Sequence, residues 1–232
     1  MNQTEVDWII WSDDQLVVLN KPAGLLVLPD GYDPTLPHVT CLLAAQFGRL
    51  WIVHRLDKDT SGLLLLARTA GAHRALNTAF ETRQVTKAYH ALVSGSPAWE
   101  EYETRQPLRV SGDRQHRTVV DARRGKPAIT RLRVLERLGG YTLIEARPET
   151  GRTHQIRAHL AALGFPIIGD SLYGGQAISP SYASPWIERM ALHAYSLEFQ
   201  HPVSGVSLSF QAPYPDDYVG VLRLLWNKIL SP

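Results

Sequence analysis

Short apolar runs separated by turn residues dominate this chain, and they predict many strands and few helices. Runs of four to eight apolar or alternating residues, bounded by Gly, Pro, Asn or Asp, are typical of strands. The run 63–67 has no polar member, so we expect a strand buried on both faces. The expected strands are 8–11, 16–19, 63–67, 86–93, 116–121, 128–136 and 141–147.

Helical spacing recurs in four segments. Apolar residues over 72–80 follow the i, i+3, i+4 pattern of an amphipathic helix. Further helices are expected over 38–48 and over 153–163, where Gly164 ends the helix. Asp216 is a candidate N-cap for the last helix. The residues that this helix is expected to bury are Val219, Leu222, Leu225, Trp226 and Ile229.

These elements favour an α+β fold, with a mixed, mainly antiparallel β-sheet core and flanking helices. Strands at hairpin-like spacing with a few covering helices do not suit a doubly wound parallel sheet. We find no internal repeat and no linker that would mark a boundary, so we expect one domain, 1–232. A hydrophobic fraction of 44% is ample for a packed core.

Cysteine and histidine usage argues against disulfides and metal sites. Cys41 is the only cysteine, so the chain has no internal disulfide and suits a reducing, cytoplasmic compartment. His154 and His159 are five residues apart and do not share a helix face as paired ligands would, so we expect no metal. The acidic N-terminus does not resemble a secretory signal, and no apolar run approaches the length of a membrane span.

The net charge is only +2, but its distribution is uneven. Residues 1–53 hold two bases and six acids, whereas residues 105–137 hold ten bases and three acids, a net of +7. Such a concentration is the footprint expected for a polyanion partner, and the solvated face of a hairpin would give the same count. The ten bases are Arg105, Arg109, Arg114, Arg117, Arg123, Arg124, Lys126, Arg131, Arg133 and Arg137.

A polar block precedes the buried strand 63–67 and reads H-R-L-D-K-D-T-S-G from His54. Loops at the edge of a rigid strand often hold catalytic groups. Asp57 in that place, with Arg55 two residues away, would stay ionised and could act as a nucleophile. The alternative is a solvated aspartate at the start of a capped strand.

A second unusual block begins at Glu149 and reads E-T-G-R-T-H-Q-I-R-A-H-L. Arg157 borders the apolar stripe of the expected helix, and a partly buried guanidinium needs an acidic partner. Asp57 is the candidate partner. The helix start after Arg152 is also suited to receiving a phosphate.

The two blocks resemble the signature motifs of the RluA family of pseudouridine synthases. In that family the catalytic aspartate lies in HRLD-x-x-TSG, and a second motif is T-G-R-x-H-Q-[IL]-R-x-H. Lesser matches follow the family order: N-K-P-A-G from Asn20, K-A-Y-H-A-L-V from Lys87 and G-K-P-A from Gly125. The resemblance leaves no room before residue 14 for the S4-type domain of longer relatives, so we expect a bare catalytic domain.

The resemblance implies an isomerase that converts uridine to pseudouridine in structured rRNA or tRNA, with the target base flipped out. It implies that Asp57 is the catalytic aspartate, that Arg157 pairs with it and that Tyr89 packs on the base. The reaction needs no redox step or donor, so we expect no cofactor, and a monomer suffices. The residues expected to contact RNA are His54, Arg55, Arg152, His154, Gln155, Arg123, Arg124 and Lys126.

Two other functions remain open from the residues alone. A non-catalytic RNA-binding or ribosome-assembly protein on the same fold would bind without product, although it has no need of Asp57, Tyr89 and Arg157 together. A hydrolase would need a second carboxylate paired with Asp57, a set of metal ligands or a G-x-S-x-G elbow, and the sequence shows no elbow, no ligand set and no carboxylate clearly paired with Asp57. Tyr89 and His154, taken singly, also fit an ordinary core tyrosine and an ordinary histidine.

Overall fold

The computed structural model describes residues 7–176 and 187–230, with side chains up to residue 227. The chain forms two compact units. Unit 1 comprises residues 1–86 and 194–213, and unit 2 comprises residues 87–193 and 214–232. The single domain expected from the sequence stays a prediction.

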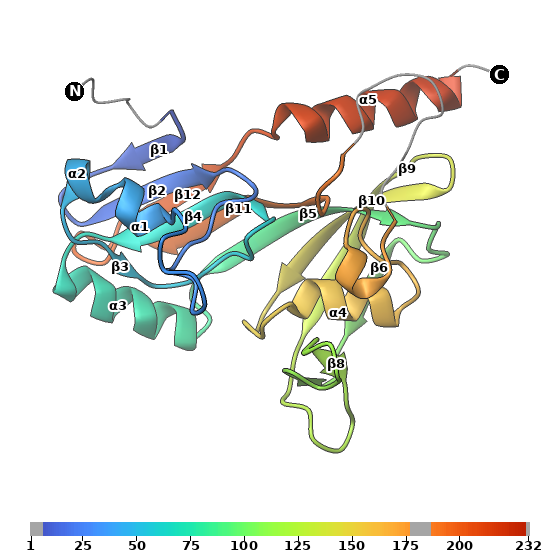
Figure 1. Ribbon diagram of the computed structural model, residues 1–232, viewed down its shortest axis with the longest axis horizontal. Helices are drawn as coiled ribbons and strands as arrows, with labels where there is room; N and C mark the ends of the chain where they lie inside the picture. Colours follow the sequence, from blue (N-terminus) through green and yellow to red (C-terminus); the bar gives the residue numbers. More distant parts are fainter. Residues whose placement is uncertain (1–6, 177–186, 231–232) are drawn as a thin grey trace. The chain divides into compact units, whose positions relative to one another are not determined.

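Unit 1 is built on antiparallel strands, and β4 is the strand around which they pair (Figure 1). All seven residues of β4 are buried, and the strand pairs with β2 over residues 62–67 and with β3 at residues 66–67. The apolar run at 63–67 therefore does form a strand buried on both faces. The elements are β1 (Ile9–Ser12), β2 (Leu16–Lys21), α1 (Val39–Leu42), α2 (Ala44–Phe47), β3 (Trp51–Ile52), β4 (Ser61–Ala67), α3 (Ala70–Glu81) and β12 (Ser207–Gln211).

Unit 2 contains a four-stranded antiparallel array in the order β5-β10-β9-β6. Helix α4 packs against β9 and β10, and the short pair β7–β8 forms a separate two-stranded sheet. The elements are β5 (Thr86–Ser94), β6 (Glu101–Thr104), β7 (Leu108–Arg109), β8 (Val119–Val120), β9 (Thr130–Arg137), β10 (Tyr141–Pro148), α4 (Gln155–Ala162), η1 (Ser171–Tyr173) and α5 (Asp216–Leu230). Strand β11 (Leu192–Gln200) begins in unit 2 and continues into unit 1, where it pairs with β12.

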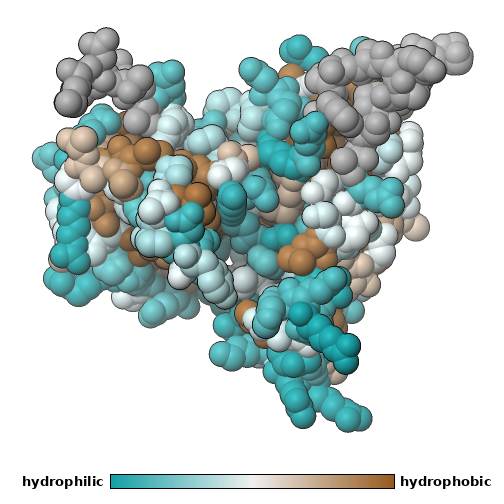
Figure 2. All heavy atoms as spheres, viewed as in Figure 1, coloured by the Kyte–Doolittle hydropathy of each residue, from teal (hydrophilic) through white to brown (hydrophobic). Residues whose placement is uncertain are grey.

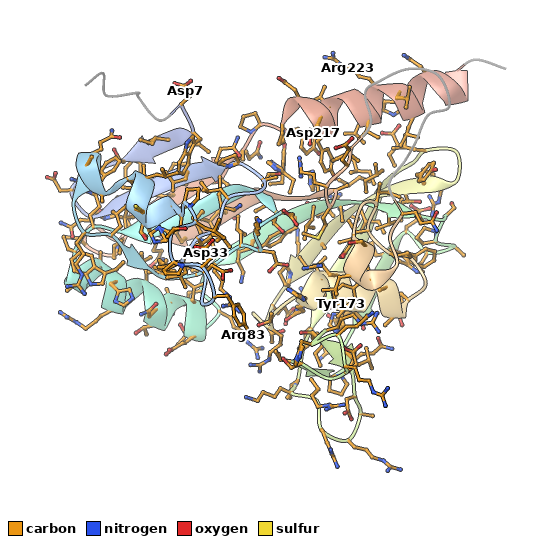
Figure 3. All side chains as sticks on the ribbon, viewed as in Figure 1. Asp7, Asp33, Arg83, Tyr173, Asp217 and Arg223 are labelled. Carbon is orange, nitrogen blue, oxygen red and sulfur yellow. The ribbon has the colours of Figure 1, made fainter. Side chains whose placement is uncertain are left out.

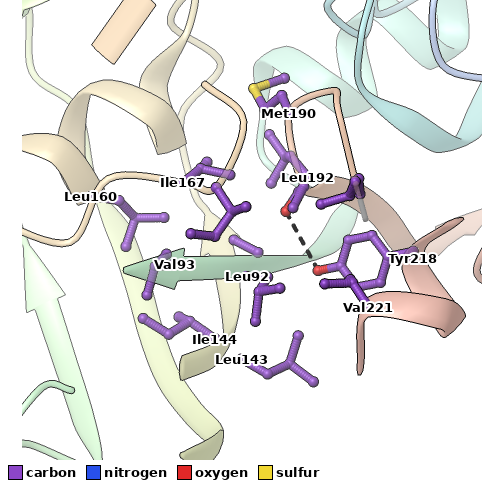
Figure 4. Close-up of a cluster of buried hydrophobic side chains, with 14 of the residues drawn as sticks. Leu92, Val93, Leu143, Ile144, Leu160, Ile167, Met190, Leu192, Tyr218 and Val221 are labelled. Atoms are coloured by element: carbon purple, nitrogen blue, oxygen red, sulfur yellow. Dashed lines mark hydrogen bonds between the residues drawn. The ribbon is translucent and has the colours of Figure 1, made fainter. Parts of the chain in front are cut away.

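Apolar side chains from β5, β10, α4 and α5 form the core of unit 2 (Figure 4). Tyr218 is fully buried in this core, and its hydroxyl donates to the carbonyl of Ala191 at 3.5 Å. Burial of these side chains removes water from both faces of β5, and apolar burial is the main source of folding free energy. The expected α+β class, with a mainly antiparallel sheet, is confirmed.

Three expectations need correction. The helix expected over 38–48 is two four-residue helices, because Leu43 ends α1 and begins α2. The strand expected over 116–121 is reduced to Val119–Val120, which pairs with β7 outside the main array. Strands β3, β6 and β7 were not anticipated, because they are only two to four residues long. Strands β11 and β12 were missed as well, although Ser207–Gln211 alternates cleanly between polar and apolar residues.

The buried face of α5 is also displaced from the expected one. Trp226 is 44% exposed, and Val219 is only partly buried. The stripe starts one residue earlier, at Tyr218, because this tyrosine packs as an apolar side chain. The buried residues are Tyr218, Val221, Leu222 and Leu225, and the Ile229 side chain lies outside the described residues.

Candidate active site

The loop 53–60 joins β3 to β4 and carries three of the expected site residues. Asp57 is partly buried and Arg55 is exposed. The main-chain carbonyl of Asp57 accepts a hydrogen bond from the Thr60 amide at 3.1 Å, which closes a turn just before β4. The carboxylate is therefore carried by a turn that leads directly into a fully buried strand.

The buried side chain of Lys21 fixes this loop by a hydrogen bond. It is fully buried, and its Nζ donates to the carbonyls of Pro22, Leu25 and Lys58 at 2.8, 2.9 and 3.0 Å. The Gly24 amide donates to the same Lys58 carbonyl at 2.9 Å. A buried ammonium is costly unless its donors are satisfied. Lys21 thus connects the segment 20–25 to the turn that carries Asp57.

His54 packs between β4 and α3. Its Nε2 accepts a hydrogen bond from the Leu65 amide at 2.9 Å, and its ring stacks on Phe80 with centroids 4.9 Å apart. Because Nε2 accepts this bond, the ring proton of the neutral imidazole is on Nδ1. The His54 side chain helps to fix the start of the loop against the strand.

Gly62 allows close approach of two strands next to the loop. Its φ is +107°, and a Cβ at this position would lie 2.3 Å from the carbonyl oxygen of Ala194 on β11. Only glycine combines this backbone conformation with that approach. The glycine of the T-S-G part of the motif is therefore explained by packing within unit 1.

Tyr89 and Arg157 both belong to unit 2, whereas Asp57 belongs to unit 1. Tyr89 lies on β5 opposite Ala146 of β10 and packs partly buried against the core of unit 2. Arg157 lies on α4, and its side chain is 11% exposed. The pairing of Arg157 with Asp57 stays a prediction.

Within unit 2 the acidic partner of Arg157 is Asp170, to which sequence analysis gave no role. The Arg157 Nε and Nη2 donate to the two carboxylate oxygens of Asp170 at 2.7 and 2.8 Å. The Asp170 side chain is 1% exposed. A two-point contact of this kind fixes the plane of the guanidinium. Thirteen residues separate the two, so no helix spacing could have identified the pair.

The start of α4 carries the other expected RNA contacts. His154 is the N-cap and has a left-handed backbone, with φ +52°, which is uncommon for a residue with a Cβ. Its Nδ1 lies 3.2 Å from the hydroxyl of Tyr173. Arg152 is partly exposed, and its Nε donates to the Pro127 carbonyl at 3.2 Å. The left-handed backbone of His154 persists only where surrounding contacts hold it.

Gln155 is buried and fully hydrogen-bonded inside the protein. Its Oε1 accepts from the Thr150 hydroxyl and the Arg152 amide, and its Nε2 donates to the Ile129 carbonyl and the Thr130 hydroxyl. All four positions of the amide are thereby used. The Gln155 side chain joins β9 to the start of α4.

The Thr130 hydroxyl continues this network to His159. It lies 2.9 Å from His159 Nδ1, and His159 Nε2 lies 2.9 Å from the Gln106 carbonyl. A carbonyl can only accept, so Nε2 carries the proton and Nδ1 accepts from Thr130. Burial lowers the pKa of His159, which favours this neutral form.

We name residues 107–127 the basic hairpin, since they contain β7, β8 and six basic side chains. In Figure 1 this segment projects from unit 2 beside α4, and Figure 2 shows hydrophilic residues over its projecting end. Its two aspartates are held inside the hairpin: Asp113 pairs with Arg117 at 2.6 Å, and Asp121 pairs with Arg109 at 2.7 Å. In the described part of the chain, no ion pair occupies Arg114, Arg123, Arg124 or Lys126, all of which are exposed.

The remaining basic residues of 105–137 are neutralised by acids that lie outside that window. Arg131 pairs with Glu103 and Glu149, and Arg133 pairs with Glu145. All of these residues except Glu149 line an open groove of about 700 Å³ over β6, β9 and β10, where acidic and basic side chains are intermixed. Arg105 and Arg137 also pair, with Glu103 and Glu100. Within residues 105–137, the positive charge that no ion pair compensates is therefore confined to the basic hairpin.

His90, the neighbour of Tyr89 on β5, is buried and shares a hydrogen bond with the Tyr214 hydroxyl. Burial lowers the pKa of its imidazole from 6.5 to about 4, although the nearby Glu145 partly opposes this. His90 therefore stays neutral in the folded protein at neutral pH.

We expect the free energy of unfolding to fall as the pH drops from about 6.5 to about 4. In this window the unfolded chain protonates His90 and the folded chain does not, which costs about 3 kcal/mol in all. Urea unfolding of wild type and His90→Gln, at roughly pH 7 and pH 4.5, measures the loss. The variant should lose clearly less stability than wild type, and equal acid sensitivity would contradict the assignment.

Among residues 7–176 and 187–230, no group of three or more His, Cys, Asp or Glu side chains is placed to hold a metal ion. Within the same ranges, no helix has the length and apolar character needed to cross a membrane.

Comparison with known proteins gives consistent matches. A family model described as RNA pseudouridylate synthase matches residues 15–162. Ribosomal large subunit pseudouridine synthase D of Zymomonas mobilis is 40% identical over 230 residues, which cover 94% of this chain and 72% of the relative. The protein of the same name from Pseudomonas aeruginosa is 40% identical over 231 residues, with 94% and 71% covered.

Two solved structures share the fold. Human RNA Pseudouridylate Synthase Domain Containing 4 superposes with a TM-score of 0.75 at 27% identity, covering 95% of this chain and 93% of that chain. Human RNA Pseudouridylate Synthase Domain Containing 1 superposes with a TM-score of 0.71 at 29% identity, covering 93% and 87%. The similarity therefore extends over both units.

Proposed function

This chain belongs to the RNA pseudouridylate synthase family, and from that premise we propose that it isomerises a uridine of large-subunit ribosomal RNA through Asp57. Family membership makes the enzyme an isomerase that acts on RNA. The choice of RNA rests on one observation: relatives named for the large ribosomal subunit are 40% identical over 94% of the chain. The loop geometry supports Asp57 as the reacting group.

The reaction breaks the bond between N1 of uracil and C1′ of the ribose, turns the base and joins C5 to C1′. One carboxylate suffices to begin it, either by attack on C1′ or by removal of the C2′ proton. Asp57 is carried on a turn in which the Lys58 carbonyl accepts hydrogen bonds from Lys21 Nζ and the Gly24 amide. A group fixed in this way loses little entropy when it meets the substrate.

Arg157 and Tyr89 complete the proposed catalytic set. Arg157 would keep Asp57 ionised and oriented, since an adjacent guanidinium favours the charged carboxylate. Tyr89 would stack on the uracil and assist loss of the C5 proton. A base inside a stem must be flipped out at a cost of a few kcal/mol, and the exposed Arg55 is suited to fill the vacated space.

The remaining residues divide between holding the site and meeting RNA. The side chains of His54 and Gln155 are engaged within the protein, so we assign them to fixing the loop and the start of α4. Arg152 and His154 are partly exposed at that helix start and would line the RNA path. We also propose that the enzyme meets its RNA in the cytoplasm as a monomer.

Pseudouridine mapping of total ribosomal and transfer RNA, from cells with and without this protein, tests the proposal. Carbodiimide labelling and primer extension should reveal a site in large-subunit rRNA that disappears with the gene and returns with the wild-type gene. A lost site in tRNA would keep the activity and overturn the choice of RNA. No lost site, together with tight RNA binding, would favour a non-catalytic RNA-binding protein.

We expect Arg123→Ala with Arg124→Ala to weaken RNA binding and to flatten its salt dependence. Each phosphate contact removed lowers the slope of log K against log salt by about 0.7 to 0.9, so the double variant should lose about 1.5. Filter binding or fluorescence anisotropy across a salt series, with a large-subunit rRNA transcript, gives the slope.

Arg131→Ala with Arg133→Ala is the matched control, because it changes the net charge equally. Those arginines already pair with glutamates on β6, β10 and the segment after β10, so their removal should leave the slope nearly unchanged. An unchanged slope in the Arg123 and Arg124 variant would return the basic hairpin to an ordinary solvated surface.

A further inference from the structure

The hydroxyl of Tyr173 joins η1 to the basic hairpin and to the start of α4. It accepts a hydrogen bond from the Thr118 amide at 2.9 Å and donates to the Thr118 carbonyl at 3.0 Å. His154 Nδ1 lies 3.2 Å away on the third side. Since the phenol has one proton and two acceptor positions, this arrangement uses its full capacity. Figure 3 labels Tyr173 beside the hairpin.

The ring of the same residue supports Arg157. The Arg157 guanidinium carbon lies 5.0 Å from the centroid of the Tyr173 ring. The guanidinium nitrogens bind Asp170, which precedes Tyr173 by three residues. A guanidinium over an aromatic face is attracted by the ring. Tyr173 therefore contacts both the proposed RNA-binding segment and a proposed catalytic residue, and all of these lie in unit 2.

Among the described residues, few other contacts attach the hairpin to the rest of unit 2. Among the described residues, Leu108 is the one hairpin residue that belongs to a buried apolar cluster. It packs there with Ala128, Ala158 and Tyr173 itself. Two other polar links are the hydrogen bonds from Arg117 Nη1 to the Leu172 carbonyl, directly beside Tyr173, and from Arg152 Nε to the Pro127 carbonyl, both at 3.2 Å. A segment with a small core opens locally at low free-energy cost. The Tyr173 contacts are thus a major restraint on the hairpin.

We propose that Tyr173 is a positioning residue that fixes the basic hairpin relative to Arg157, so that bound RNA is held in register with this arginine. The inference rests on the proposed function, because it assigns the hairpin to RNA and Arg157 to the reaction. The hydroxyl contacts favour RNA binding because they order the hairpin in advance. A loose hairpin would have to be ordered when RNA binds, which lowers the affinity. The ring serves turnover, since it orients the guanidinium.

Two variants separate these contributions. Tyr173→Phe removes the three hydroxyl contacts and keeps the ring under Arg157; the KM for an rRNA transcript should rise about tenfold, and kcat should change little. Tyr173→Leu also removes the ring, and kcat should then fall a further tenfold or so. Tyr102→Phe is the control, because it removes an exposed hydroxyl from the same unit and should leave both constants unchanged.

Two further measurements do not depend on turnover. Hydrogen exchange of the Thr118 amide should accelerate in Tyr173→Phe, and the Kd for the transcript, measured in an Asp57→Ala background, should rise by the same factor as KM. A wild-type KM and Kd in Tyr173→Phe, or a normal kcat in a folded Tyr173→Leu, would overturn the proposal. Absence of product from wild type would instead contradict the proposed function, and the exchange and Kd results would still decide the role of Tyr173.

Discussion

Asp57→Asn is expected to abolish pseudouridine formation while RNA binding stays within about twofold of wild type. Asparagine has nearly the same shape, and the Thr60 amide bonds to the main chain of Asp57, so the turn should persist. The variant lacks only the negative charge and basicity that the reaction requires. Loss of an essential reacting group costs on the order of 10⁴-fold or more in kcat. Single-turnover assays on an rRNA transcript, with parallel binding measurements, give both numbers.

The same turn supplies a matched control. Asp59 is two residues further on and exposed, so Asp59→Asn makes an identical chemical change beside the proposed reacting group. This variant should retain wild-type kcat. Turnover by Asp57→Asn at more than a small fraction of the wild-type rate would remove Asp57 from its role, and an equal loss in Asp59→Asn would point to damage of the loop.

Gly62→Ala is expected to lower the free energy of unfolding by about 3 to 5 kcal/mol. The new methyl group would meet the main chain of Ala194 at 2.3 Å, and the backbone at φ +107° is unfavourable for any residue with a Cβ. Neither backbone can shift without breaking strand pairing next to the loop that carries Asp57. Urea denaturation measures the loss, and activity should fall with it.

Gly205→Ala separates the two causes of this effect. Gly205 also has a positive φ, +70°, but a Cβ there would meet nothing within 4 Å. Its replacement should therefore cost about 1 kcal/mol, the ordinary price of a left-handed backbone. If the two variants lose equal stability, the close approach of Gly62 to β11 is not what restricts this position.

Local patterns predicted the parts of this protein whose cause is local. The buried strand β4 follows from an unbroken apolar run, and the turn that carries Asp57 follows from the polar block before it. Helix α4 ends where Gly164 adopts its left-handed conformation. In each case the residues that decide the structure are neighbours in sequence.

The parts that sequence analysis missed depend on distant residues. Asp170 binds Arg157 only because the chain returns to α4 after thirteen residues. The basic count over 105–137 overstated the free charge, because Glu103 and Glu145 approach from neighbouring strands and Glu149 from the residue just after β10. Pairing across a sheet cannot be read from a linear window.

The basic hairpin also affects how easily the RNA preference of such an enzyme can change during evolution. Its arginines neutralise its two aspartates, and among the described residues Leu108 is its one member of a buried apolar cluster. Substitutions at its exposed tip should therefore leave the core of unit 2 undisturbed. In evolutionary terms, RNA recognition and catalysis are therefore separable. Substitutions at a few exposed positions can change the preferred RNA while selection on the catalytic residues stays the same.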